Sequence, residues 1–133
     1  MKILIKKDKV SNFYYFYISE ISKPPLVSYS TISTNVNIDF SENRLVYGIE
    51  FIGGLKFVEQ SYQERTIKTF QDKNSLNLVF LDNNEKNNID EIDTNEENIR
   101  NKIKIFMLEG NVIKIQINKE ILYSGNFDQI QYD

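Results

Sequence analysis

The chain has 133 residues, a formal net charge of −3, and neither cysteine nor histidine. We expect residues 1–133 to form a single domain, because a chain of this length can bury a core without help from a metal or a disulfide. The missing cysteines exclude thiolate metal sites and cysteine nucleophiles, and the missing histidines remove the commonest metal ligand and the usual general base at neutral pH. We therefore expect no metal, no cofactor and no catalytic residues.

The charge pattern argues against nucleic acid and membrane partners. Residues 1–54 hold 6 Lys and Arg against 5 Asp and Glu, whereas residues 55–133 hold 10 against 14. Such a balance offers phosphate backbones and anionic lipids no overall attraction. The first ten residues lack the apolar core of a signal peptide, and no apolar run approaches the roughly 18 residues of a membrane span. We expect a soluble, cytoplasmic protein that binds neither nucleic acid nor membranes directly.

Alternating apolar and polar residues predict three strands in the first part of the chain. They cover Lys2–Lys7, Phe13–Ser19 and Leu26–Ser33. The second strand contains five consecutive aromatic residues, which favours a central strand that is covered on both faces. It places Tyr15 and Tyr17 on one face. If that face is uncovered, we expect a protein interface there, because Tyr and Phe are enriched in interface cores.

The stretch Asn35–Ile52 predicts a β-hairpin with a polar turn. Pairing Phe40 with Leu45 creates one wholly apolar face, made of Val36, Ile38, Phe40, Leu45, Tyr47, Ile49 and Phe51. The opposite face carries the candidate site residues Asn37, Asp39 and Glu50. In this register about 13 Å separates Asp39 from Glu50, which is too far for the paired carboxylates of a glycosidase.

One or two short helices are predicted in the second part of the chain, at residues 61–71 and 95–101, because each follows a capping box. The strands predicted there are Leu76–Leu81, Lys102–Glu109, Val112–Asn118 and Ile121–Ser124, with Leu55–Val58 as a further extended segment. We expect a β-rich fold of mainly antiparallel sheets, either all-β or α+β with one or two short helices. It divides into an N-terminal β module over residues 1–54 and a β-rich continuation over residues 55–133.

Residues 82–98 are the most polar part of the chain, with seven acidic residues and one lysine. One interpretation is a solvated, flexible acidic loop, because like charges repel each other and resist packing. The other is a surface that meets a basic, nucleic-acid-binding groove on a partner protein. Its candidate binding residues are Asp90, Glu91, Asp93, Glu96 and Glu97.

Other motifs that carry chemistry fail on spacing. Read as a calcium loop, residues 82–93 have Lys86 at a ligand position and Asn87 where glycine is required. No Ser-x-x-Lys sequence occurs in the chain. Gly53-Gly54 is not followed by the Lys-Ser or Lys-Thr of a phosphate-binding loop. These absences leave carboxylates, tyrosines and lysines as the only candidates for catalysis.

An internal echo relates two parts of the chain. The segments Asn-Val, Ile-Asp-Phe and Leu-Val-Tyr-Gly of residues 35–48 are matched by Asn-Val, Ile-Gln-Ile and Ile-Leu-Tyr-Ser-Gly in residues 111–125. The chain is rich in Asn and Ile, so composition alone can produce such a match. The echo therefore suggests a duplication without establishing one.

The hairpin also carries a family resemblance. The aromatic strand, the strand Val36–Phe40 with its Asp39, and the triplet Gly48-Ile49-Glu50 resemble a small bacterial family of uncharacterised domains. The chain departs from the family pattern at Asn43, where family members have a glycine in the turn. The resemblance covers about residues 1–52. It implies a strand, a turn and a second strand, and it brings no catalytic residues.

These observations favour a non-catalytic protein-binding module, namely a small inhibitor or accessory factor of a bacterial or phage system in defence or anti-defence. We expect the partner to be another protein, and self-association into a homo-oligomer is left open. One alternative is a small-ligand or nucleotide-binding protein with a pocket between its sheets. A carboxylate-based enzyme is less favoured, since it would need Asp8, Asp39 or Glu50 to converge in one cleft.

Overall fold

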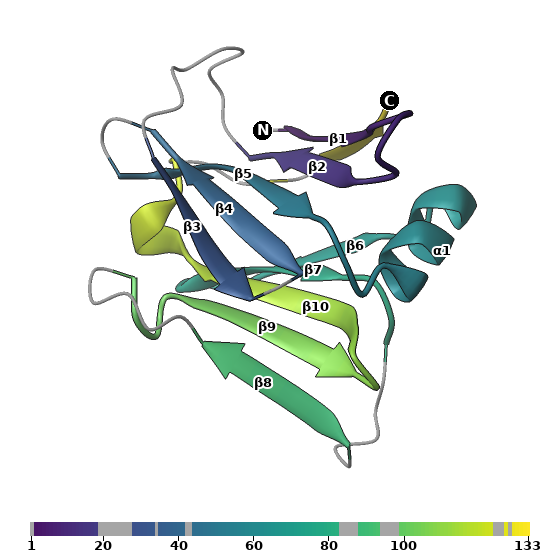
Figure 1. Cartoon of the computed structure of the whole chain (residues 1–133). Helices are drawn as coiled ribbons and strands as arrows, with labels where there is room; N and C mark the ends of the chain where they lie inside the picture. Colours follow the sequence, from purple (N-terminus) through teal and green to yellow (C-terminus); the bar gives the residue numbers. More distant parts are fainter. Residues whose placement is uncertain are drawn as a thin grey trace.

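The structure is a computed structural model that describes residues 2–18, 28–33, 35–41, 44–82, 88–93, 99–123, 127 and 129–133. Within these residues the chain forms two mainly antiparallel sheets and one short α-helix (Figure 1), so the predicted β-rich fold is confirmed. The elements in chain order are β1 (Lys2–Lys7), β2 (Tyr14–Tyr17), β3 (Ser28–Ser33), β4 (Val36–Phe40), β5 (Val46–Phe51), α1 (Lys56–Glu64), β6 (Lys68–Gln71), β7 (Ser75–Val79), β8 (Ile89–Asp93), β9 (Ile103–Leu108), β10 (Asn111–Asn118), the 3-10 helix η1 (Lys119–Ile121) and β11 (Gln129–Tyr132).

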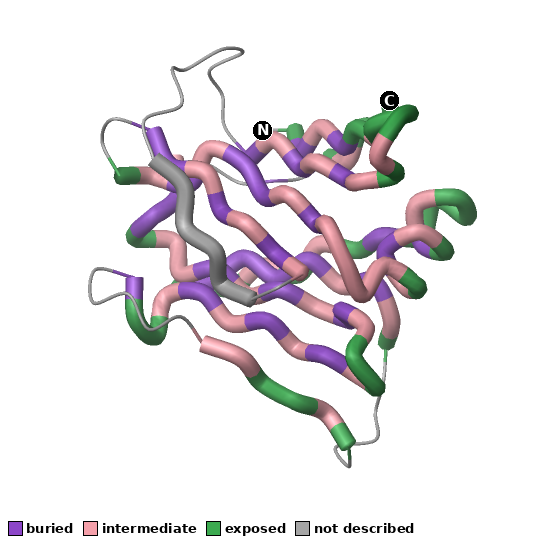
Figure 2. Tube along the Cα trace, viewed as in Figure 1, coloured by how far each residue is buried: buried purple, intermediate pink, exposed green. Residues whose placement is uncertain are grey.

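The two sheets pack against each other through one face each. Sheet A has the strand order β11-β1-β2-β5-β4-β3, and sheet B has the order β6-β7-β10-β9-β8. The strand β2 therefore lies inside its sheet, as predicted. The expected cover on both faces is wrong, because Tyr14 and Phe16 are buried whereas Tyr15 and Tyr17 on the outer face are partly exposed. Buried and partly exposed residues alternate along the strands (Figure 2), so each sheet turns its apolar side chains toward the other. Helix α1 lies at one end of the two sheets (Figure 1).

Three phenylalanines join the sheets at the centre of the core. Phe16 of β2, Phe51 of β5 and Phe80, which follows β7, are all buried. Their ring centroids lie 5.0 to 5.7 Å apart in edge-to-face arrangements, which aromatic rings prefer. Side chains thus occupy the space between the sheets around these rings, and the hollows described below lie on the outer surface of the molecule.

The two sheets repeat one unit of five strands. The order β1-β2-β5-β4-β3 in sheet A is matched by β6-β7-β10-β9-β8 in sheet B, with antiparallel neighbours throughout. Both units have a β-bulge at the same place, at Tyr47 in β5 and at Ile113 in β10. The carbonyl of each bulge accepts an equivalent bond, from the Ile18 amide at 3.0 Å and from the Phe80 amide at 2.8 Å. Sheet A differs by gaining β11, which pairs with β1 in parallel.

This register replaces the alignment suggested by the sequence echo. The echo matched β4 with residues at the start of β10, whereas the structure matches β4 with β9 and β5 with β10. Equivalent core positions then hold similar side chains, such as Ile38 and Ile105, or Val46 and Val112. The similarity between the two units is therefore found in their inward-facing residues, because both units pack these residues into the core in the same way.

The repeat extends to the first turn of each unit. The Asp8 carboxylate accepts bonds from the backbone amides of Val10 and Ser11, and the Asp72 carboxylate accepts bonds from the amides two and three residues after it. These bonds hold the pKa of both carboxyl groups below the usual value, because they stabilise the ionised form. Both carboxylates thus stabilise the turns in which they lie.

The register predicted for the β4–β5 hairpin is wrong at two places. Phe40 pairs with Val46 instead of Leu45, so the connection between the strands is one residue longer than predicted, and the bulge shifts the register once more. The bulge inserts Tyr47 as an extra residue in β5, which reverses the facing of the residues on the turn side. Val46 is therefore buried in the core, whereas Tyr47 is half-buried and contacts outward-facing side chains.

The helix lies earlier than predicted. Helix α1 spans Lys56–Glu64, so the expectations of an extended segment at residues 55–58 and of a helix at 61–71 are both wrong. Ser61 lies inside the helix, where its hydroxyl donates to the Phe57 carbonyl at 2.7 Å instead of capping an N-terminus. Arg65 ends the helix in the left-handed conformation, with φ of 57°. Residues 68–71 then form β6 and pair with β7.

The acidic segment is not one continuous loop. Residues 89–93 form β8, the edge strand of sheet B, so a loop over all of residues 82–98 is wrong for this part. The helix expected at 95–101 falls largely outside the described residues. The strand expected at Ile121–Ser124 is also wrong, because its first residue ends the 3-10 helix η1.

Candidate functional site

Five of the residues singled out in the sequence lie on the outer face of sheet A: Tyr15 and Tyr17 of β2, Asn37 and Asp39 of β4, and Glu50 of β5. One row across the sheet runs from Tyr15 through Glu50 to Asn37, since these residues are register partners. The second row runs from Tyr17 through Gly48 to Asp39. Together with Tyr47, we call these five residues the tyrosine face.

Gly48 lets the ring of Tyr15 lie across β5. A Cβ atom at residue 48 would stand 2.4 Å from the Cε1 atom of that ring, which is far inside van der Waals contact. The Tyr15 hydroxyl thereby reaches β4 and donates a hydrogen bond to Asp39 Oδ2. Burial raises the pKa of Tyr15 well above its ordinary value, and the hydrogen bond and charge of Asp39 raise it further.

The raised pKa of Tyr15 predicts a loss of stability in alkali. The unfolded chain ionises this tyrosine near its ordinary pKa of 10.0, while the folded chain keeps it protonated. Ionisation therefore favours unfolding, so the stabilisation is complete below pH 10 and declines as the pH rises above it. We expect the urea midpoint to fall mainly above about pH 10, and to fall less in Tyr15→Phe. An equal fall in both proteins would show that Tyr15 contributes nothing to the alkaline loss.

The three tyrosines of the face lie side by side. The ring centroids of Tyr15 and Tyr17 are 4.5 Å apart, and those of Tyr17 and Tyr47 are 5.8 Å apart. Lys6 of β1 places its ammonium 6.0 Å from the Tyr17 centroid. Tyr47 was not expected here, because the alternation of the sequence assigned it to the core. Only the bulge brings it to the outer face.

The two carboxylates of the face are closer than predicted but have separate partners. The longer connection and the bulge together place Asp39 two residues from the register partner of Glu50, a diagonal of about 7–8 Å instead of about 13 Å. Asp39 accepts from Tyr15, and Glu50 accepts from Asn37 Nδ2 at 3.3 Å. Glu50 lines a hollow of about 290 Å³ with Asp8 and Tyr15, and Asp39 does not line it. The two groups therefore do not share a cleft.

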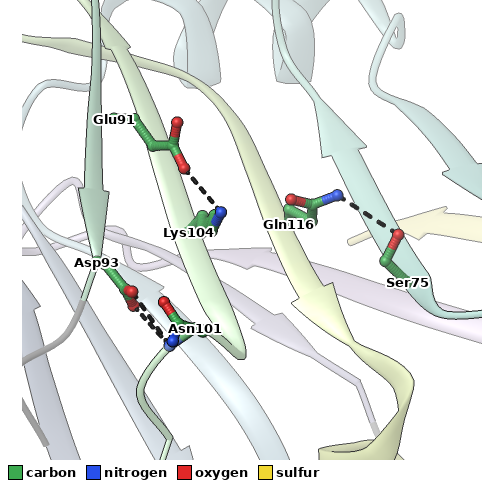
Figure 3. A network of polar contacts seen from close by, with 6 residues as sticks. All are labelled: Ser75, Glu91, Asp93, Asn101, Lys104 and Gln116. Carbon is green, nitrogen blue, oxygen red and sulfur yellow. Dashed lines mark hydrogen bonds and ion pairs between the residues drawn. The ribbon is translucent and has the colours of Figure 1, made fainter.

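The acidic candidates of β8 are partly used within the fold. Figure 3 shows Glu91 pairing with Lys104 at 3.0 Å and Asp93 accepting bonds from the Asn101 amide at 3.1 and 3.2 Å. Asp90 is exposed. Glu96 and Glu97 lie outside the described residues. The structure thus places the three described candidates, Asp90, Glu91 and Asp93, on the other sheet from the tyrosine face and does not bring the two sets together.

The outer face of sheet B carries residues that the sequence did not single out. Asn77 stands at the position equivalent to Tyr15, Lys114 at that of Gly48 and Phe106 at that of Asp39. A hollow of about 460 Å³ is open among them. No motif in the sequence points to these residues. The repeat register alone identifies them as outward-facing neighbours.

Two further observations describe the part of the chain covered by the structure. No three acidic side chains there lie close enough together to hold a metal ion. Its one α-helix is too short and too polar to cross a membrane. Comparison of the chain with protein-family models, with curated proteins and with solved structures found no match.

Proposed function

We propose that the chain is a non-catalytic protein-binding module and that the tyrosine face is its contact surface. The observation that carries this proposal is the row of three adjacent tyrosine rings on the outer face of sheet A. Tyrosines are enriched in protein interfaces because the rigid ring packs against apolar side chains while the hydroxyl forms hydrogen bonds with polar groups or water. A face of this kind suits a protein partner.

The charges around the tyrosines support a protein partner over nucleic acid. Asp39 and Glu50 lie within the face and would repel a phosphate backbone, which needs several uncompensated cations. The Tyr15 and Tyr17 rings meet in a tilted arrangement and the Tyr17 and Tyr47 rings meet edge to face, so neighbouring rings cover part of the faces on which bases would stack. A partner with basic and polar side chains matches the two carboxylates and the hydroxyls.

The separation of the carboxylates supports a non-catalytic role. An acid and base pair must act on one substrate within one cleft. Here Asp39 and Glu50 do not line one hollow, and each carboxylate already accepts a hydrogen bond. Asp8 lines the hollow of Glu50, but its carboxylate accepts bonds from the backbone amides of its own turn. The narrower role, as an inhibitor or accessory factor of a bacterial or phage defence system, rests on the small size and composition of the chain and is part of the proposal.

Affinity capture with matched variants tests the proposal. The wild-type protein, Tyr17→Ala/Tyr47→Ala and Val10→Ala are immobilised separately and exposed to extract of the native host. Val10 is the control, since it is an exposed apolar residue outside both the tyrosine face and the hollow of sheet B. We expect at least one protein to be captured by wild type and Val10→Ala but lost with the tyrosine variant.

The affinity of the captured protein gives the quantitative check. Removing two central interface tyrosines should weaken binding at least about tenfold, or roughly 1.4 kcal/mol. Thermal unfolding of the tyrosine variant must show that it remains folded. Capture of the same proteins with the same affinity by all three forms would contradict the proposal.

A further inference from the structure

A second surface, which we call the sheet B hollow, lies on the opposite side of the molecule from the tyrosine face. Its volume is about 460 Å³, and its floor is formed by outward-facing side chains of β6, β7, β9 and β10. The residues used below are Phe70, Asn77, Val79, Phe106, Lys114 and Gln116. Figure 1 shows no described helix over this face of sheet B.

The repeat explains why the centre of this face is open, whereas a ring covers the equivalent position of the tyrosine face. In sheet A the large ring of Tyr15 crosses over Gly48 to reach Asp39. In sheet B the equivalent of Tyr15 is the short Asn77, which cannot span the neighbouring strand. The inward-facing residues of the two units are alike in kind, whereas these outward-facing ones differ. The two outer faces therefore present different surfaces to a partner.

Asn77 presents a buried acceptor without a donor. Its side chain is only 6% exposed, and its Nδ2 donates to the Phe70 carbonyl at 3.3 Å. Its Oδ1 has no hydrogen-bond partner among the residues that the structure describes. A buried acceptor of this kind costs free energy until a donor reaches it. Gln116, which faces Asn77 across the β7–β10 pair, donates instead to Ser75 at 3.5 Å (Figure 3).

The central charge of the hollow is positive and has no carboxylate partner. Lys114 places its ammonium 4.3 Å from the centroid of the Phe106 ring, and no carboxylate of the described residues lies within ion-pair distance of it. The other two lysines of this face are paired at its edges, Lys68 with Asp82 at 2.9 Å and Lys104 with Glu91 at 3.0 Å. Of the two carboxylates that line the hollow, Asp82 is the partner of Lys68, and Asp72 accepts bonds from the backbone amides of its own turn. A ligand at the centre of the hollow therefore meets the Lys114 cation above an aromatic ring.

We propose that the sheet B hollow binds an extended acidic segment of a partner protein. A backbone N–H of the segment donates to Asn77 Oδ1 once the Gln116 side chain moves aside, and an Asp or Glu carboxylate beside it pairs with Lys114. An apolar side chain of the segment packs on Phe70, which is 67% exposed. This surface is distinct from the tyrosine face, so the proposal does not depend on the function proposed above.

A peptide fits the hollow better than a nucleic acid strand. A strand would need a row of uncompensated cations for its phosphates, and here Lys114 is the one central lysine without a carboxylate partner among the described residues. An acidic segment needs one such cation, one acceptor for its amide and one apolar contact. The hollow supplies these three features next to one another.

Peptide display on the intact protein tests the proposal. A library of random 12-residue peptides is panned against the full chain, and the most enriched peptide is labelled and titrated by fluorescence anisotropy. We expect the enriched sequences to place Asp or Glu next to an apolar residue. Binding should weaken at least tenfold in Lys114→Glu and at least fivefold in Asn77→Leu, which removes the acceptor but keeps the size of the side chain.

Lys56→Glu is the matched control, because Lys56 also stands over a phenylalanine ring, that of Phe57 at 5.3 Å, but lies on α1 away from the hollow. It should change affinity less than twofold. Circular dichroism confirms folding, and Lys114→Gln replaces Lys114→Glu if the charge reversal unfolds the chain. No enrichment, enrichment without acidic residues, unchanged affinity in the Lys114 variants, or competition by a 20-nucleotide oligothymidylate would each overturn the proposal.

Discussion

Replacing Phe51 with alanine is expected to lower the free energy of unfolding by about 3–5 kcal/mol. Phe51 is fully buried, and its ring meets Phe16 at 5.0 Å and Phe80 at 5.3 Å. Phe16 belongs to sheet A, and Phe80 follows β7 of sheet B. Truncating Phe51 thus leaves a cavity at the contact between the two units, which the rigid sheets cannot collapse to fill. Urea unfolding followed by circular dichroism measures the loss.

Phe70→Ala is the control for this prediction. It removes the same side chain from a position that is 67% exposed on an outer face. A surface truncation of this kind should change stability by no more than about 0.5 kcal/mol. Similar losses in the two variants would mean that the Phe16, Phe51 and Phe80 cluster does not hold the sheets together.

A second large effect is expected at Gly48, and its sign should depend on Tyr15. In the wild-type background, Gly48→Ala pushes the Tyr15 ring off β5 and separates its hydroxyl from Asp39. A hydrogen bond to a charged group contributes about 1.5–3 kcal/mol, and the exposure of the site places the expected loss near the lower limit. In a Tyr15→Ala background the ring is gone, so Gly48→Ala should stabilise the strand by about 0.5–1 kcal/mol.

The double-mutant cycle separates this account from a backbone effect. If Gly48 is needed only for its backbone conformation, alanine will destabilise both backgrounds equally and the coupling energy will be zero. A change of sign between the backgrounds shows that the glycine is there to admit the Tyr15 ring. Chemical denaturation of the four proteins provides the four free energies.

Much of the fold follows from alternation in the sequence. The strand at Lys2–Lys7 and the strands on either side of Gly110 could be predicted because a half-buried strand must alternate apolar and polar residues. The placement of Asn37, Asp39 and Glu50 on one face of the hairpin follows from the same rule. These predictions depend only on which face each residue occupies.

Features set by pairing across strands could not be predicted in this way. The bulge at Tyr47 shifts the register of one hairpin, and nothing in the local residues marks it. Ser61 and Glu64 match a capping box, which predicts a helix that includes residues 68–71. Those residues form β6 instead, because they pair with β7. The parallel addition of β11 to β1 joins the two ends of the chain, which no local pattern can signal.

The candidate surfaces show the same limit. The tyrosine face could be predicted in part, because aromatic residues in a strand must face one side of the sheet or the other. The sheet B hollow could not be predicted, because Asn77, Lys114 and Phe106 are far apart in sequence and none belongs to a motif. Only the repeated register shows that they are neighbours and that they replace Tyr15, Gly48 and Asp39.

Site-specific photo-crosslinking in the native host tests the central claim most directly. The photoreactive residue p-benzoylphenylalanine replaces Tyr17 on the tyrosine face or, as a control, Val10, which is 94% exposed in the β1–β2 turn. We predict a discrete covalent adduct with another protein from residue 17 and none from residue 10. No adduct from residue 17, or the same adducts from both positions, would contradict a binding role for the tyrosine face.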